Sequence, residues 1–115
     1  MGNKTVGQRG EDRAAQFLVE RGFRVVERNY RCRYGEADIV VQSRRGIGLI
    51  EVKARGSDAF GLPAEAIGQT KVRRMQRIGE CWRQERNAST MVWLGVVTIL
   101  GNGSPELITE IEAVD

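Results

Sequence analysis

Three charged residues, Asp38, Glu51 and Lys53, have types and spacing that could support metal-dependent chemistry. Alternate residues of a β-strand point to the same face, so Glu51 and Lys53 would project together, opposite Ile50 and Val52. Taken alone, this acid-x-lysine triplet is equally typical of an ion pair on a half-exposed strand. A second carboxylate beside it is what would favour a site.

The polar segment 43–46 is suited to a hairpin turn between two strands. A hairpin centred between Arg44 and Arg45 places Asp38 opposite Glu51, and directly paired side chains lie about 5 Å apart at Cβ. In the same register Glu36 falls opposite Lys53, so Glu36 has two interpretations: a partner of Lys53 or of an arginine, or a member of the site. The register therefore predicts two facing carboxylates.

Two carboxylates directly across a ladder repel each other unless a proton or a cation lies between them. Hard oxygen ligands, with no histidine in the chain, favour Mg²⁺ or Mn²⁺ over zinc. Lys53 could then orient or help deprotonate a metal-bound water and offset charge in the transition state. This is the set of groups that phosphodiester hydrolysis requires.

Alternating helix and strand patterns predict the elements that would position these residues. Apolar periodicity and β-branched content predict helices over 8–21 and 63–86, the first ended by Gly22 and the second begun by Pro63. Ile67, Met75, Ile78 and Trp82 form the buried stripe of the second helix. Strands are predicted over 23–28, 37–42, 48–53, 91–100 and 107–114. The predicted order is α-β-β-β-α-β-β.

Composition predicts one α/β domain spanning residues 1–115, because 41% of the 115 residues are apolar and no linker or repeat divides them. Two distant cysteines and no histidine exclude zinc sites and histidine-based catalysis, and Cys32 and Cys81 are interpreted as reduced apolar fillers. The N-terminus lacks a signal-like apolar region, and the run 91–100 is too short to span a bilayer. We expect a cytoplasmic protein with no membrane partner.

Arginine supplies fifteen of the 18 basic residues, and the net charge is +3. The guanidinium group suits phosphate, and it also suits carboxylate. The arginines of the second helix therefore have two interpretations: an ordinary solvated face, or a track for nucleic-acid phosphates. Charge alone does not decide between them.

The segment Gly35-Glu36-Ala37-Asp38 followed by Glu51-Val52-Lys53 resembles the PD-(D/E)xK nuclease signature. More narrowly, the chain resembles the YraN-like family of small bacterial endonuclease-like proteins, which are related in fold to archaeal Holliday junction resolvases. The similarity covers about the first two thirds of the chain. It includes the segments 7–11, 28–31 and 60–66, and Lys71 with Arg74.

The resemblance implies a restriction-endonuclease-like αβββαβ core with a mixed central sheet flanked by helices. It also implies roles. Asp38 and Glu51 would bind Mg²⁺ or Mn²⁺ together with the main-chain carbonyl of Val52, and Lys53 would position the attacking water. Glu11 would add to the metal site, its alternative being a carboxylate that favours a helix N-terminus. Nucleic-acid phosphates would lie near Lys71, Arg74 and Arg55.

Two functions from different classes remain open at this point. One is a metal-dependent endonuclease that acts on DNA, including branched or repair and recombination structures. The other is a catalytically inactive nucleic-acid-binding or scaffolding domain with the same fold. Related resolvases are symmetric dimers, and we expect at most a weak homodimer here.

Overall fold

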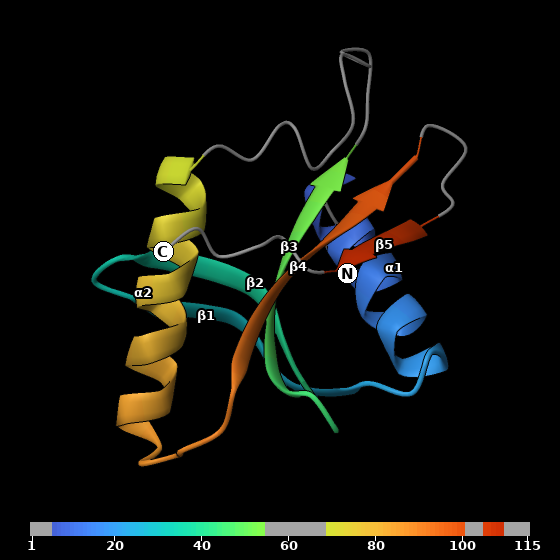
Figure 1. Cartoon of the computed structure of the whole chain (residues 1–115). Coiled ribbons are helices and arrows are strands. Elements are labelled where there is room, and N and C mark those ends of the chain that lie inside the picture. Colours follow the sequence, from blue (N-terminus) through green and yellow to red (C-terminus); the bar gives the residue numbers. More distant parts are fainter. Residues whose placement is uncertain (1–5, 55–68, 101–104, 110–115) are drawn as a thin grey trace, which may run out of the picture.

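The protein folds into a mixed five-stranded sheet that lies between two helices (Figure 1). The structure, a computed structural model, describes residues 6–54, 69–100 and 105–109. The elements, in chain order, are α1 (Val6–Glu20), β1 (Arg24–Cys32), β2 (Gly35–Ser43), β3 (Gly46–Ala54), α2 (Gln69–Glu85), β4 (Val92–Ile99) and β5 (Pro105–Thr109). No helix in these ranges is both long enough and apolar enough to cross a membrane.

The strands follow one another across the sheet in sequence order, from β1 to β5. Strands β1, β2 and β3 are antiparallel neighbours, β3 and β4 are parallel, and β4 and β5 are antiparallel. The parallel pair is possible because the connection containing α2 returns the chain to the starting end of β3. The predicted α/β class, the αβββαβ order and the mixed sheet flanked by helices are confirmed.

Each face of the sheet has its own hydrophobic core, one under each helix. The α1-side core contains Ala14, Leu18, Ile39, Val41, Ile50, Trp93 and Val97. The α2-side core includes Val40, Leu49, Val72, Met75, Ile78, Trp82, Leu94 and Val96. Because β4 is covered on both faces, its sequence is a nearly continuous apolar run. The predicted stripe of α2 is confirmed for Met75, Ile78 and Trp82, while Ile67 lies outside the described residues.

The hairpin between β2 and β3 has the predicted register, with pairs running from Ser43–Gly46 to Ile39–Ile50. Gly46 occupies a left-handed conformation at φ +110°, which a residue with a side chain would adopt only under strain. The strand ends differ from the predictions. Strand β1 continues to Cys32 because its backbone pairs with β2 as far as Gly35, whatever the polarity of the side chains. Pro63 and the chain beyond Thr109 lie outside the described residues.

Gly48→Ala is expected to destabilise the protein because the indole of Trp93 lies directly against Gly48. A Cβ at Gly48 would stand 2.4 Å from Cζ2 of Trp93, a distance that forces the ring or the strand to move. Overpacking of this kind costs about 1–3 kcal/mol, measurable as a lower urea midpoint.

Gly10→Ala is the matched control, with the opposite expected sign. A Cβ at Gly10, within α1, would make only ordinary contact with Cγ1 of Ile99 at 3.8 Å. Alanine in a helix interior is favoured over glycine by about 0.5–1 kcal/mol. A Gly48→Ala protein as stable as the parent would contradict this description of the Trp93 contact.

Candidate metal and catalytic site

Asp38 lies where the pairing of β2 with β3 stops. The ladder ends at Ile39–Ile50, and Oδ2 of Asp38 accepts a hydrogen bond of 2.7 Å from the backbone N–H of Val52. The regular alternation of side chains along β2 is interrupted at this point. Ala37 and Val40 are three residues apart and should face opposite sides of the sheet, yet both belong to the α2-side core. The carboxylate of Asp38 is therefore fixed beside the segment of β3 that carries the other site residues.

Strand β1 has a matching irregularity at Asn29. The pairs Arg28–Ile39 and Tyr30–Ala37 place Asn29 opposite Asp38. Asn29 has φ +54°, a left-handed conformation that asparagine tolerates better than most residues. The kink sends the side chain of Arg28 toward α1 and that of Tyr30 into the α2-side core.

The pKa of Asp38 is raised from 3.8 to about 6. Burial is the largest cause, because it disfavours the charged form, and the hydrogen bond from Val52 opposes it. The charges of Glu51, Glu11 and Glu36 raise the pKa further. The ionised carboxylate is thus held in surroundings that a bound cation would make more favourable.

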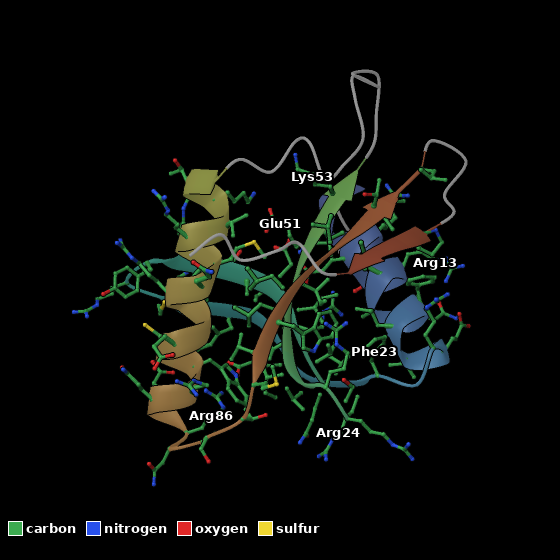
Figure 2. The ribbon with its side chains drawn as sticks, in the orientation of Figure 1. Arg13, Phe23, Arg24, Glu51, Lys53 and Arg86 are labelled. Atoms are coloured by element: carbon green, nitrogen blue, oxygen red, sulfur yellow. The ribbon has the colours of Figure 1, made fainter. Side chains whose placement is uncertain are left out.

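Glu51 points away from Ile50, as strand alternation predicted, and the structure shows that this face of β3 meets α2. Its Oε1 lies 2.5 Å from Nζ of Lys71, and its side chain is only 17% exposed. Lys71 was expected near nucleic-acid phosphates, and the structure places its ammonium group on the carboxylate of Glu51. Figure 2 shows Glu51 and Lys53 following one another toward the C-terminal end of β3.

Lys53 makes no ion pair or hydrogen bond with any of the residues that the structure describes. Its parallel neighbour in β4 is Thr98, which is 1% exposed. Oγ1 of Thr98 has no hydrogen-bond partner within the described ranges, which is unusual for a buried polar atom. Sequence reasoning missed Thr98, although it is the single hydroxyl residue in the apolar run 91–100.

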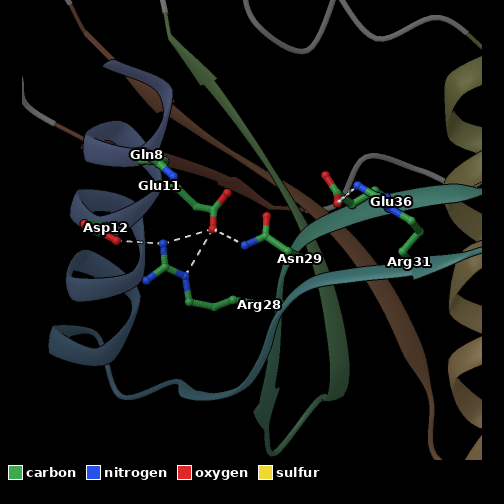
Figure 3. Close-up of a pocket in the computed structure, with 7 residues that line it drawn as sticks. All are labelled: Gln8, Glu11, Asp12, Arg28, Asn29, Arg31 and Glu36. Carbon is green, nitrogen blue, oxygen red and sulfur yellow. Dashed lines mark hydrogen bonds and ion pairs between the residues drawn. The ribbon is translucent and has the colours of Figure 1, made fainter. Parts of the chain in front are cut away.

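Glu11 anchors α1 to the kink in β1 (Figure 3). Its Oε1 accepts hydrogen bonds from Nε and Nη2 of Arg28, at 3.1 and 2.9 Å, and from Nδ2 of Asn29 at 3.0 Å. Arg28 also pairs with Asp12 at 2.7 Å. In this structure Glu11 thus holds α1 against the irregular part of β1.

A pocket of about 560 Å³ opens beside these contacts. It is lined by Gln8, Glu11, Asp12, Arg28, Asn29, Arg31 and Glu36 (Figure 3). Glu36 pairs there with Arg31 at 3.1 Å, which is the arginine alternative considered for it. Asp38, Glu51 and Lys53 do not line the pocket, although Glu11 and Glu36 influence Asp38 through their charges.

Comparison with known proteins shows where the chain belongs. The model of the family described as "Uncharacterised protein family UPF0102" matches residues 10–99. The chain belongs to the UPF0102 family. A UPF0102 protein of Mycolicibacterium gilvum is 46% identical over 95% of this chain and 92% of its own length. A UPF0102 protein of Caldicellulosiruptor saccharolyticus is 36% identical over 94% of this chain and 92% of its own length.

UPF0102 is the YraN family, so the resemblance drawn from the motifs is confirmed at the level of the family. A third relative, the UPF0102 protein of Trichlorobacter lovleyi, is 39% identical over 96% of this chain and 89% of its own. The match over residues 10–99 includes Glu11, Asp38, the segment 51–53 and Lys71. The expected site therefore lies within the part of the chain that UPF0102 proteins share.

The donor atoms of this UPF0102 site suit a magnesium or manganese ion. Mg²⁺ commonly keeps several waters and uses one or two protein carboxylates, a number that Asp38 and Glu51 supply. No three acidic, histidine or cysteine side chains converge on one point within residues 6–54, 69–100 and 105–109. Glu11 is thus not grouped with Asp38 and Glu51 here. The main-chain carbonyl of Val52 would add a further hard oxygen donor.

The remaining predicted residues fall in different places. Arg74 is exposed on α2, next to the β1–β2 hairpin. Arg55 and the segment 60–66 lie outside the described residues.

Proposed function

We propose that this UPF0102 protein is a divalent-metal-dependent endonuclease that hydrolyses phosphodiester bonds in DNA. The observation that carries the proposal is the position of Asp38, which is held against Val52 with a raised pKa. Glu51 lies within the range of that electrostatic effect, and Lys53 shares its strand face. Such a group of residues is typical of metal-assisted phosphoryl transfer.

Each residue has a distinct role in the proposed reaction. Mg²⁺ or Mn²⁺ held by Asp38, Glu51 and the Val52 carbonyl would supply Lewis-acid stabilisation of charge on the phosphate. The N–H of Val52 keeps the Asp38 carboxylate in one orientation. Lys53 orients the attacking water by hydrogen bonding and offsets the negative charge that develops on the phosphoryl oxygens. Lys71 neutralises the charge of Glu51 in the metal-free protein.

The Lys71–Glu51 pair also favours a second candidate, a catalytically inactive nucleic-acid-binding domain. An ammonium group 2.5 Å from Oε1 of Glu51 balances that charge without any metal ion. In such a protein the acidic residues would serve stability alone. The two candidates differ in what a divalent ion does.

Incubation of the protein with labelled four-way junction, flap, duplex and single-stranded DNA tests the proposal. We expect cleavage in Mg²⁺ or Mn²⁺ and none in chelator. Glu51→Gln should lower the cleavage rate at least about 100-fold, because it removes a charged ligand of the metal. Glu80→Gln, an exposed acid of α2 paired with Arg83, is the matched control and should cleave normally. Absence of cleavage on every DNA, with binding retained, would favour the inactive binding domain.

A further inference from the structure

The arginines of α2 divide into two groups according to their partners. Toward the C-terminal end, Arg83 pairs with Glu80 at 2.8 Å, and Arg86, the first residue after the helix, pairs with Glu27. Toward the N-terminal end, three exposed arginines form no ion pair within the described part of the chain: Arg73, Arg74 and Arg77. These three fall within about 100° of the helix circumference, so their charges lie together, and no carboxylate of the described residues forms an ion pair with them.

The tip of the β1–β2 hairpin adds a fourth arginine to this group, together with a tyrosine that contacts two of the arginines. Cζ of Arg33 lies 4.9 Å from the ring centroid of Tyr34, and its Nη2 donates to the Tyr34 hydroxyl at 2.9 Å. Cζ of Arg77 lies 5.7 Å from the same ring. A Cβ at Gly35 would stand 3.2 Å from Cδ of Arg74, so the hairpin backbone packs against that side chain.

Figure 1 shows this hairpin lying alongside α2. We call the resulting cluster the arginine surface, which consists of Arg33, Tyr34, Arg73, Arg74 and Arg77. Its four guanidinium groups come from two elements that are distant in the sequence, and all four arginines are exposed.

Tyr34 prepares the arginine surface for an anionic ligand. Contacts with its ring restrict the side chains of Arg33 and Arg77, so less conformational entropy is lost when a ligand binds them. Planar guanidinium groups donate paired hydrogen bonds that match phosphate oxygens. A polyanion with closely spaced phosphates could engage several of these arginines together.

The arginine surface leads toward the candidate site along α2. This helix begins near the C-terminal end of β3, and its residue Lys71 reaches Glu51 (Figure 1). Arg74 and Arg77 follow at about 4.5 and 9 Å along the helix axis from Lys71. A nucleic-acid backbone bound to these arginines would therefore extend toward Asp38 and Glu51.

We propose that the arginine surface binds the phosphate backbone of double-stranded DNA and does so without a divalent ion. Duplex DNA is the ligand that fits, because it carries one negative charge per about 1.7 Å of helix axis and presents phosphates in regular rows. The choice of DNA rests on the proposed function, whereas the binding itself does not require Asp38, Glu51 or Lys53.

Fluorescence anisotropy with labelled duplex DNA in chelator tests this inference, since no cleavage interferes. The double variant Arg74→Ala, Arg77→Ala should bind about 10-fold more weakly or worse. The slope of log K against log salt concentration should fall by about one to two, as expected when one or two phosphate contacts are lost. Circular dichroism melting checks that the variant is folded.

Arg13→Ala, Arg24→Ala is the matched control, because it removes the same net charge. Figure 2 shows Arg13 on α1 and Arg24 at the start of β1, both away from α2. Their loss should change the affinity less than about twofold, as for surface charges outside the contact. Equal weakening by the two double variants would overturn the inference, since it would show a general effect of net charge.

The remaining outcomes separate this inference from the proposed nuclease function. If the double variant Arg74→Ala, Arg77→Ala binds duplex DNA as tightly as the parent, the inference that the arginine surface binds DNA is wrong, even if metal-dependent cleavage persists. Binding that depends on the surface, with no cleavage in Mg²⁺ or Mn²⁺, would support it and count against the nuclease. Binding of anionic lipid vesicles with none of duplex DNA would also overturn it.

Discussion

Lys53→Met is expected to lower the rate of Mg²⁺-dependent DNA cleavage by roughly 100- to 10,000-fold, the range for loss of a group that handles a proton. The melting temperature should stay the same, because Lys53 makes no ion pair or hydrogen bond in the described structure. Binding to DNA in chelator should also be retained, because the arginine surface is intact. Single-turnover cleavage with enzyme in excess is the measurement, since it reports the chemical step without product release.

Lys53→Arg shows which property of the lysine matters. Arginine keeps the positive charge but does not lose its proton in proteins. Cleavage by Lys53→Arg near the parent rate would show that charge stabilisation is sufficient, while a loss equal to that of Lys53→Met would indicate orientation or deprotonation of water. Unchanged cleavage by Lys53→Met itself would remove Lys53 from the mechanism.

Asp38→Asn is expected to stabilise the metal-free protein at pH 8. The pKa of Asp38 is about 6 in the folded protein against 3.8 for an ordinary aspartate, so the folded state binds this proton more tightly than the unfolded state. Stability from this group is therefore present below pH 4 and is lost as the pH rises from about 4 to 6. Asparagine carries no charge, and its side-chain oxygen can still accept the hydrogen bond from Val52.

At pH 8 the free energy of unfolding of Asp38→Asn should exceed that of the parent by about 1–2 kcal/mol, a value smaller than the full pKa shift implies because Asp38 is partly exposed. The difference should vanish near pH 4. Urea unfolding in chelator at the two pH values measures it. Addition of Mg²⁺ or Mn²⁺ should stabilise the parent protein by binding to the folded state and leave Asp38→Asn nearly unchanged. If Asp38→Asn is less stable than the parent at pH 8 without metal, the ionised carboxylate of Asp38 does not destabilise the folded protein, and the prediction is wrong.

Local patterns predicted most of the secondary structure and the register of the central hairpin. The turn at Arg44 and Arg45 joins two strands directly, so its position sets which residues of β2 and β3 face each other. Strand alternation likewise predicted that Glu51 points away from Ile50, which lies in the α1-side core. The extension of β1 to Cys32 was not predicted, because backbone pairing with β2 decides it.

Local patterns failed where the chain departs from regular geometry. The left-handed conformation of Asn29 and the interrupted alternation at Asp38 arise together on paired strands, under α1. Alternation alone would have placed Asp38 in an unbroken ladder opposite Glu51, whereas its carboxylate accepts a hydrogen bond from Val52. The hydroxyl of Thr98 could be singled out only from the structure, because it is buried without a hydrogen-bond partner among the described residues.

The sequence by itself determined the α/β class, the element order and the identity of the acidic and basic residues near β3, because these follow from periodicity, turn residues and motif spacing. Only the tertiary structure decided which charges meet. Lys71 reaches Glu51, Arg28 reaches Glu11, and Arg77 reaches Tyr34 because α1 and α2 pack on opposite faces of the sheet. Contacts between distant elements depend on helix orientation and core packing, which no local pattern encodes.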